Sequence, residues 1–193
     1  MKEINKVLII VFSVAIIFSA CRRDTKAEIL NATADNGHVE LPFACDLVNE
    51  AQMKEILGKA EFEFEILDGN RTAQNENSTS CFYKWFDNIY DDSGVLIQLQ
   101  RNPLPDEIPD YVTAMFKVKM WDGENTYQGG NETHTYTVFE GLSVPALYNT
   151  DLKQYYFGLG TQVLGMVAFN YPIDQEKLDA AFIQIANTMI NEL

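Results

Sequence analysis

Residues that usually carry out catalysis are scarce in this sequence. Only two histidines, His38 and His134, occur among 193 residues. His38 lies in a polar stretch and His134 alternates with Tyr136 as in a strand, so both are expected to be solvated. The sequence contains no Gly-x-Ser-x-Gly, no His-Glu-x-x-His and no phosphate-binding loop. These absences disfavour a hydrolase, and we expect a protein that is not an enzyme and holds no cofactor.

Basic residues are also few. The chain has 14 lysines and arginines against 28 acidic residues, which gives a formal net charge of −14. A charge this negative repels the phosphates of nucleic acids and anionic lipid headgroups. We therefore expect no nucleic-acid partner, whereas a basic protein would be attracted. The plainer interpretation of the charge is that it keeps the protein soluble.

Only one long apolar run is present, and it lies at residues 7–18. Its dozen residues fall short of the roughly 20 needed to span a bilayer. The run follows a short charged start and precedes small residues, which is the layout of a secretory signal peptide. A signal-anchor helix and a plain signal peptide are the alternatives. Phe18-Ser19-Ala20-Cys21 resembles a bacterial lipobox, which implies that residues 1–20 are removed and that Cys21 is lipidated.

The lipobox resemblance implies an exported protein anchored to the membrane of the cell envelope by its N-terminal lipid. Arg22 follows the cysteine, where aspartate is associated with inner-membrane retention in many Gram-negative bacteria, so an outer-membrane location is expected in such a host. Residues 21–40 are polar and predict a flexible tether. Residues 41–193 have the length of one folded domain.

Two cysteines remain besides Cys21. Cys45 and Cys81 form an even pair in an exported chain, which favours a disulfide in an oxidising compartment. Two free thiols or half of a metal site are the alternatives, although neither histidine has a ligand-like spacing. The acidic cluster at Asp87, Asp91 and Asp92 lacks the full calcium-binding loop, so we expect no metal site there either.

The pattern of the chain predicts an α+β fold. Asn49-Glu50-Ala51-Gln52 has the form of a capping box for a helix that ends at Gly58. A second amphipathic helix follows Asp174. Residues 111–120 fit both a helix and a strand, and their composition favours the helix. Strands are expected near residues 60–66, 81–86, 95–100, 133–139, 153–159 and 162–169.

The first of these strands reads Ala60-Glu61-Phe62-Glu63-Phe64-Glu65-Ile66 and alternates strictly. Phe62, Phe64 and Ile66 are expected to point inward and the three glutamates outward. The glutamate row has two interpretations. It is either a cation-binding face or, more commonly, a solvated face that protects an edge strand from aggregation.

Cys45-Asp46-Leu47-Val48 and the helix ending in Leu57-Gly58, with Cys81 opening an aromatic strand, resemble a family of small exported bacterial lipoproteins. The resemblance is confined in motif to the cysteine region, although the order of elements fits from Phe43 to Leu193. It implies a disulfide and an antiparallel sheet flanked by helices, similar to the PsbP-like α/β/α sandwich. It implies no activity, because the family has no general assigned one.

Aromatic residues are the remaining signal of function, because tyrosine and tryptophan favour recognition surfaces. The leading hypothesis is a lipid-anchored, non-enzymatic binding module for an envelope protein or a small apolar ligand. An immunity-like inhibitor of a basic toxin or enzyme is the first alternative, and an envelope hydrolase is the disfavoured second. The candidate recognition residues are Tyr83, Trp85, Trp121, Tyr127 and Tyr136.

Overall fold

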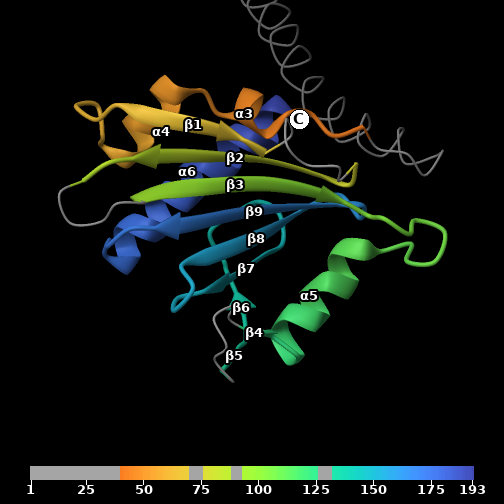
Figure 1. The fold of residues 1–193 in the computed structure, drawn as a ribbon. Coiled ribbons are helices and arrows are strands. Elements are labelled where there is room, and N and C mark those ends of the chain that lie inside the picture. Colours follow the sequence, from red (N-terminus) through yellow and green to blue (C-terminus); the bar gives the residue numbers. More distant parts are fainter. Residues whose placement is uncertain (1–39, 70–75, 88–92, 126–131) are drawn as a thin grey trace, which may run out of the picture.

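A seven-stranded antiparallel sheet forms the centre of the molecule (Figure 1). The computed structural model describes residues 40–69, 76–87, 93–125 and 132–193. The strand order is β1-β2-β3-β9-β8-β7-β6. The bounds are β1 Phe64–Asp68, β2 Ser78–Trp85, β3 Ser93–Arg101, β6 Thr137–Val138, β7 Ala146–Asn149, β8 Gln154–Leu159 and β9 Val163–Asn170. With its helices, the sheet confirms the predicted α+β class.

Helices lie on both sides of the sheet (Figure 1). The helices are α3 Ala44–Leu47, α4 Glu50–Leu57, α5 Tyr111–Trp121 and α6 Gln175–Glu192. Helices α3, α4 and α6 cover one face, which we call the inner face, and α5 lies against the other, the outer face. The short strands β4 Glu124–Asn125 and β5 Thr133–His134 pair separately. Within the described residues, none of these helices combines the length and apolarity that a membrane crossing requires.

Helix α4 begins and ends where its local sequence predicts. The Asn49 side chain accepts a hydrogen bond from the Gln52 backbone at 3.0 Å, and the Asn49 backbone donates to the Gln52 side chain at 2.9 Å. Gly58 ends the helix with φ of 62°, a left-handed conformation that glycine adopts without a steric cost. The predicted capping box is therefore confirmed.

The inner core forms between the sheet and three helices. Helix α6 contributes the predicted apolar stripe, of which Leu178, Phe182, Ile185 and Met189 are buried. The Phe182 ring stacks on Tyr155 of β8 with a centroid separation of 4.2 Å. Helix α6 follows β9 along the chain, and this stacking holds it against the sheet.

Residues 111–120, whose sequence fits both a helix and a strand, form a helix, which confirms the favoured prediction. Asp110 caps α5 by accepting a hydrogen bond from the Thr113 backbone at 3.1 Å. Val112 and Phe116 lie one turn apart and are both buried against the outer face. A Cβ on Gly158 would lie 2.7 Å from Val112 Cγ1, so glycine at this position lets α5 approach β8 closely.

Two strand predictions need correction. The strand expected over residues 133–139 is two short strands, β5 and β6, because the Tyr136 backbone donates to the Lys119 carbonyl at 3.1 Å and leaves the ladder there. The strand expected at 60–66 begins only at Phe64, because residues 60 and 61 form a turn in which the Phe62 backbone donates to the Lys59 carbonyl. Strand β7 was not predicted from the sequence. It lies between β8 and β6 in the sheet.

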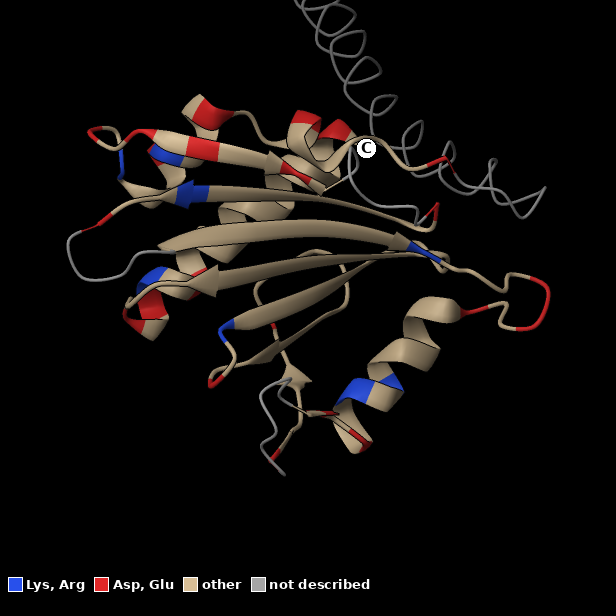
Figure 2. Ribbon diagram, in the orientation of Figure 1, with Lys and Arg blue, Asp and Glu red and all other residues tan. Residues whose placement is uncertain are grey.

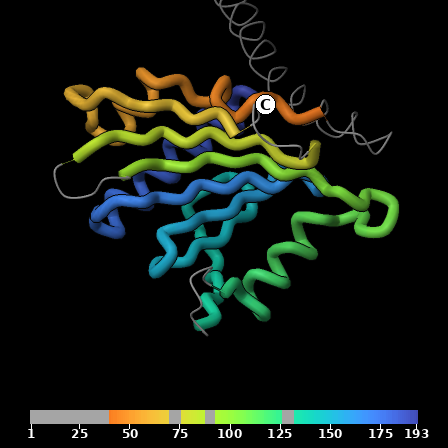
Figure 3. Tube along the Cα trace, viewed as in Figure 1, coloured from red at the N-terminus to blue at the C-terminus, as the bar shows by residue number. Residues whose placement is uncertain are grey.

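Strand β9 joins the early and late parts of the chain, since it lies between β3 and β8 (Figure 3). Directly paired residues on adjacent strands share a face of the sheet. Leu67 pairs with Phe82, Phe82 with Leu96, and Leu96 with Ala168. These four residues therefore form one apolar row across the outer face, which we call the outer row.

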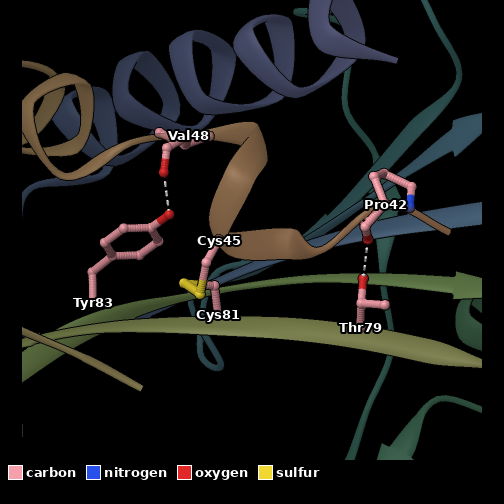
Figure 4. Close-up of a disulfide and its surroundings, with 6 residues drawn as sticks. All are labelled: Pro42, Cys45, Val48, Thr79, Cys81 and Tyr83. Carbon is pink, nitrogen blue, oxygen red and sulfur yellow. Dashed lines mark hydrogen bonds between the residues drawn. A yellow bond between two sulfur atoms is a disulfide. The ribbon is translucent and has the colours of Figure 1, made fainter. Parts of the chain in front are cut away.

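The disulfide joins α3 to β2 (Figure 4). Cys45 and Cys81 are bonded, with Cα atoms 5.0 Å apart. Two hydrogen bonds support the same junction, one from Thr79 Oγ1 to the Pro42 carbonyl at 3.0 Å and one from the Tyr83 hydroxyl to the Val48 carbonyl. The bond confirms the predicted pair and is incompatible with free thiols or a metal site at these two cysteines.

Candidate functional site

Helix α5 has almost no polar face, which makes its surroundings the first candidate for binding. Of its 11 residues, only Thr113, Lys117 and Lys119 are strongly polar. A helix that is apolar on all sides is usually covered on all sides. Here Val118 is 44% exposed and Trp121 is 73% exposed. Figure 2 shows acidic residues on the loops and on α4 and β1, whereas α5 carries lysines alone.

Lys119 lies on the buried side of α5, where it is held by a polar network. Its ammonium group forms an ion pair with Glu124 and donates a hydrogen bond to the Tyr156 hydroxyl at 2.9 Å. Tyr156 in turn donates to Glu124 at 3.1 Å, and Tyr136 donates to the other carboxylate oxygen at 2.6 Å. Tyr136 also contacts Gln154 by a hydrogen bond. The charge of Lys119 is therefore balanced within the fold.

Burial sets the protonation of this network. Burial lowers the pKa of Lys119 to about 8, while the carboxylate of Glu124 favours the ammonium form. Burial raises the pKa of Tyr156 to about 12 and also raises the pKa of Tyr136. Both hydroxyls remain protonated at neutral pH, so they act as hydrogen-bond donors and not as bases. The network is suited to orienting a bound group more than to proton transfer.

A small cavity of about 40 Å³ lies beside this network, between α5 and the sheet. Met115 and Lys119 line it from α5, Leu164 and Met166 from β9, and Tyr156 from β8. The side chains of Gln98 and Gln100 on β3 also line it. Neither carboxamide forms a hydrogen bond within the described part of the chain, so both are available to a bound molecule.

The cavity adjoins the outer row, because its lining pair Gln98 and Met166 lies two residues along β3 and β9 from the pair Leu96 and Ala168. Leu67 on the edge strand β1 is 45% exposed, and Phe82, Leu96 and Ala168 are half-buried. Leu96 and Ala168 also pack against the core beneath α5. The described surface thus combines a polar cavity with an adjoining apolar row. We call the cavity and the outer row together the outer groove.

The sequence-based recognition residues do not form one exposed surface. Tyr83, Trp85 and Tyr136 are buried, so the prediction that they belong to an exposed patch is wrong. Each of these side chains points to a side of its strand or turn that other parts of the protein cover. Trp121 is exposed at the end of α5. Tyr127 lies outside the described residues, as do Cys21, His38 and most of the tether at 21–40.

Sequence reasoning missed the residues that line the cavity. Lys119 follows Val112 and Phe116 at helical spacing, and a lysine on an apolar face is a signal that could have been followed. Gln98 and Gln100 alternate with buried Ile97 and Leu99, which indicates one polar face of a strand. Their meeting with Lys119 depends on the pairing of β3 with β9, which no local pattern predicts.

Among the described residues, no cluster of metal ligands accompanies this site. Across the described ranges, histidine, cysteine and acidic side chains nowhere gather in a group of three or more that could hold an ion. His134 lies 3.7 Å from Asp151, measured from Nδ1 to a carboxylate oxygen, and no third such ligand joins the pair within the described residues. No protein-family model, curated protein or solved structure matches the chain. The function is therefore inferred from the residues of the site.

Proposed function

We propose that this protein is an envelope-anchored, non-enzymatic binding module that holds a small ligand with an apolar body in the outer groove. The observation that carries the proposal is the junction of the cavity beneath α5 with the outer row. One end offers unpartnered carboxamides, and the other offers half-buried apolar side chains. Ligand sites commonly combine mostly apolar walls with a few well-placed polar groups.

The apolar body of the ligand would lie along the outer row. Leu96 and Ala168 begin this path next to the cavity, and Phe82 and Leu67 continue it toward the sheet edge. Covering such surface contributes about 25 cal/mol for each Å² removed from water. The cavity of about 40 Å³ is too small for a whole ligand, so only a terminal polar group would enter it.

The polar end of the ligand is expected to be neutral. Gln98 and Gln100 offer both donors and acceptors, as an amide or hydroxyl group requires. The charge of Lys119 is already paired with Glu124, so the described residues that line the cavity offer no free cation for a carboxylate. The net charge of −14 adds a general repulsion against anionic ligands. These features favour a neutral amphipathic molecule.

Photolabelling tests this function. A neutral acyl amide with a diazirine in its chain is incubated with the full-length protein in vesicles, and the labelled peptides are mapped by mass spectrometry. We expect labels on β3, β9 and α5. Leu96→Glu should reduce this labelling about tenfold, since the new carboxylate would lose hydration beneath the ligand. Val138→Glu, at a 61% exposed position on the opposite edge strand, is the matched control. Equal labelling of both variants would contradict the proposal.

The anchoring part of the proposal rests on the sequence around Cys21. Cys21→Ser should release the protein from the membrane pellet, because only that thiol can accept the lipid. Fractionation with and without detergent checks this expectation, and a variant that pellets like the parent would disprove the lipid anchor. A covalent lipid would keep the outer groove near membranes, where neutral amphipathic molecules are concentrated.

We also propose that the fold belongs with the exported lipoproteins that share the Cys-Asp-Leu…Cys pattern and with PsbP-like sandwiches. Helices on both faces of an antiparallel sheet support this relationship. The disulfide between α3 and β2 supports it at the one region where the motifs correspond.

A further inference from the structure

A second feature lies away from the outer groove, where a lysine is surrounded by aromatic rings on the inner face. Lys59 Nζ lies 4.6 Å from the ring centroid of Phe62, 5.4 Å from that of Trp85 and 5.7 Å from that of Tyr171. The rings come from the turn after α4, the end of β2 and the residue after β9. We call these three rings the aromatic cage.

The chemistry of the aromatic cage does not match a primary ammonium well. A lysine ammonium carries three hydrogen-bond donors. Within the described residues, the Lys59 ammonium group forms no ion pair or hydrogen bond, and its close partners are π faces. A quaternary ammonium has no N–H donors and is attracted to such faces without losing hydrogen bonds. The cage is therefore better suited to a quaternary cation than to its own lysine.

Two buried polar atoms of the cage residues also lack a hydrogen-bond partner in the described part of the chain. Trp85 is 1% exposed and Tyr171 is 7% exposed. Within the described residues, Trp85 Nε1 and the Tyr171 hydroxyl have no hydrogen-bond partner. Such groups are destabilising when left unsatisfied. The two rings lie nearly edge to face with centroids 4.9 Å apart, so both donors belong to the same small region.

The surroundings of the cage favour cations. Phe62 is flanked by Glu61 and Glu63, which are both exposed. A carboxylate-lined approach raises the local concentration of cations. Behind the cage, Phe64 stacks on Trp85 with centroids 5.2 Å apart and supports that wall. Glu61 and Glu63 therefore lie beside a feature that attracts cations, whereas Glu65 pairs with Lys84 on the outer face of the sheet.

We propose that Phe62, Trp85 and Tyr171 form a binding site for a quaternary ammonium group, which Lys59 occupies in the unliganded protein and leaves on binding. Lys59 is half-buried, and the chain enters its turn through Gly58. Its side chain can move outward and recover its hydration. This inference does not depend on the ligand of the outer groove, which lies on the other face of the sheet.

Tryptophan fluorescence tests the site in the full-length protein. The chain has two tryptophans, so Trp121→Phe leaves Trp85 as the reporter. Tetramethylammonium and choline should change its emission in a saturable way, whereas 3,3-dimethylbutanol, the uncharged analogue of choline, should not. Lys59→Gln should bind about tenfold more tightly, because it removes the competing ammonium. Phe62→Ala, in an exposed turn, should abolish binding.

Lys54→Gln is the matched control. Lys54 Nζ also lies over an aromatic ring, 5.3 Å from the centroid of Phe64, but it is paired with Glu50 at 2.7 Å. Its replacement should leave the affinity unchanged. Equal binding of the uncharged analogue, or no gain from Lys59→Gln, would overturn the proposal. Competition by phosphatidylcholine vesicles, by a trimethyl-lysine peptide or by free choline alone would identify the source of the same cationic group.

Discussion

Raising the pH from 10 to 12 is expected to unfold this protein. Burial raises the pKa of Tyr156 and of Tyr171 to about 12, and it raises the pKa of Tyr83, Tyr136 and Tyr155 as well. In the unfolded chain these hydroxyls ionise near pH 10. The folded state therefore holds the tyrosine protons more tightly, and the stability that these tyrosines contribute is full below pH 10 and falls as the pH rises. Each tyrosine contributes a loss of about 1.4 kcal/mol per pH unit.

Lys119 works in the opposite direction over a lower range. Because burial lowers its pKa to about 8, the unfolded chain binds more protons between about pH 8 and pH 10.5, and stability rises there. One lysine is outweighed above pH 10 by several tyrosines. Urea titrations at half-unit intervals of pH should therefore show a shallow rise followed by a steep fall in the free energy of unfolding.

Tyr171→Phe provides the control for the alkaline transition. The Tyr171 hydroxyl has no hydrogen-bond partner within the described residues, so the substitution removes an ionisable group without breaking a bond. Stability at pH 7 should change by less than about 0.5 kcal/mol or increase slightly. The alkaline fall should become shallower by about 1.4 kcal/mol per pH unit. An unchanged slope would show that Tyr171 does not hold its proton through burial.

Loss of the Cys45–Cys81 disulfide is expected to lower the free energy of unfolding by roughly 3–4 kcal/mol. The bond closes a loop with a sequence separation of 36, and the chain-entropy argument gives this range for a loop of that length. Loss of the bond acts mainly by raising the conformational entropy of the unfolded chain, so the native fold should survive. Urea unfolding of Cys45→Ala/Cys81→Ala, compared with the oxidised parent, measures the effect.

The reduced parent is the matched control for the double variant, since it lacks the bond but keeps both side-chain volumes. It should unfold close to the double variant. Thiol labelling of denatured, unreduced Cys21→Ser protein should detect no reactive thiol. Two reactive thiols for each chain, or coincident unfolding curves for the oxidised and reduced parent, would contradict the bond.

Local signals predicted the elements whose ends are set by local chemistry. The capping box at Asn49 and the left-handed Gly58 depend only on neighbouring residues, and α4 follows them closely. The stripe of α6 is long enough for its period to be unambiguous. Residues 111–120 were harder because α5 is apolar on nearly all sides, so its period does not separate a helix from a strand.

The candidate site was less accessible to sequence analysis. Alternation in β2 shows that Tyr83 and Trp85 share a face, but only the position of the covering helices shows that this face is buried. The cavity joins Gln98 with Lys119 and Tyr156, and these residues meet through the β3–β9 and β8–β9 pairings. The break between β5 and β6 likewise comes from a contact of Tyr136 with α5. Such long-range registers are not encoded in local patterns.

The central claim is that the outer groove holds a small amphipathic molecule. Its most direct test is mass spectrometry of the compounds released by organic extraction of full-length protein isolated from envelopes, with Leu96→Glu isolated in parallel. We predict one neutral compound with an apolar chain, released in near-equimolar amount from the parent and depleted about tenfold in the variant. Release of the same compounds in the same amounts from both proteins, or of none from the parent, would contradict the account.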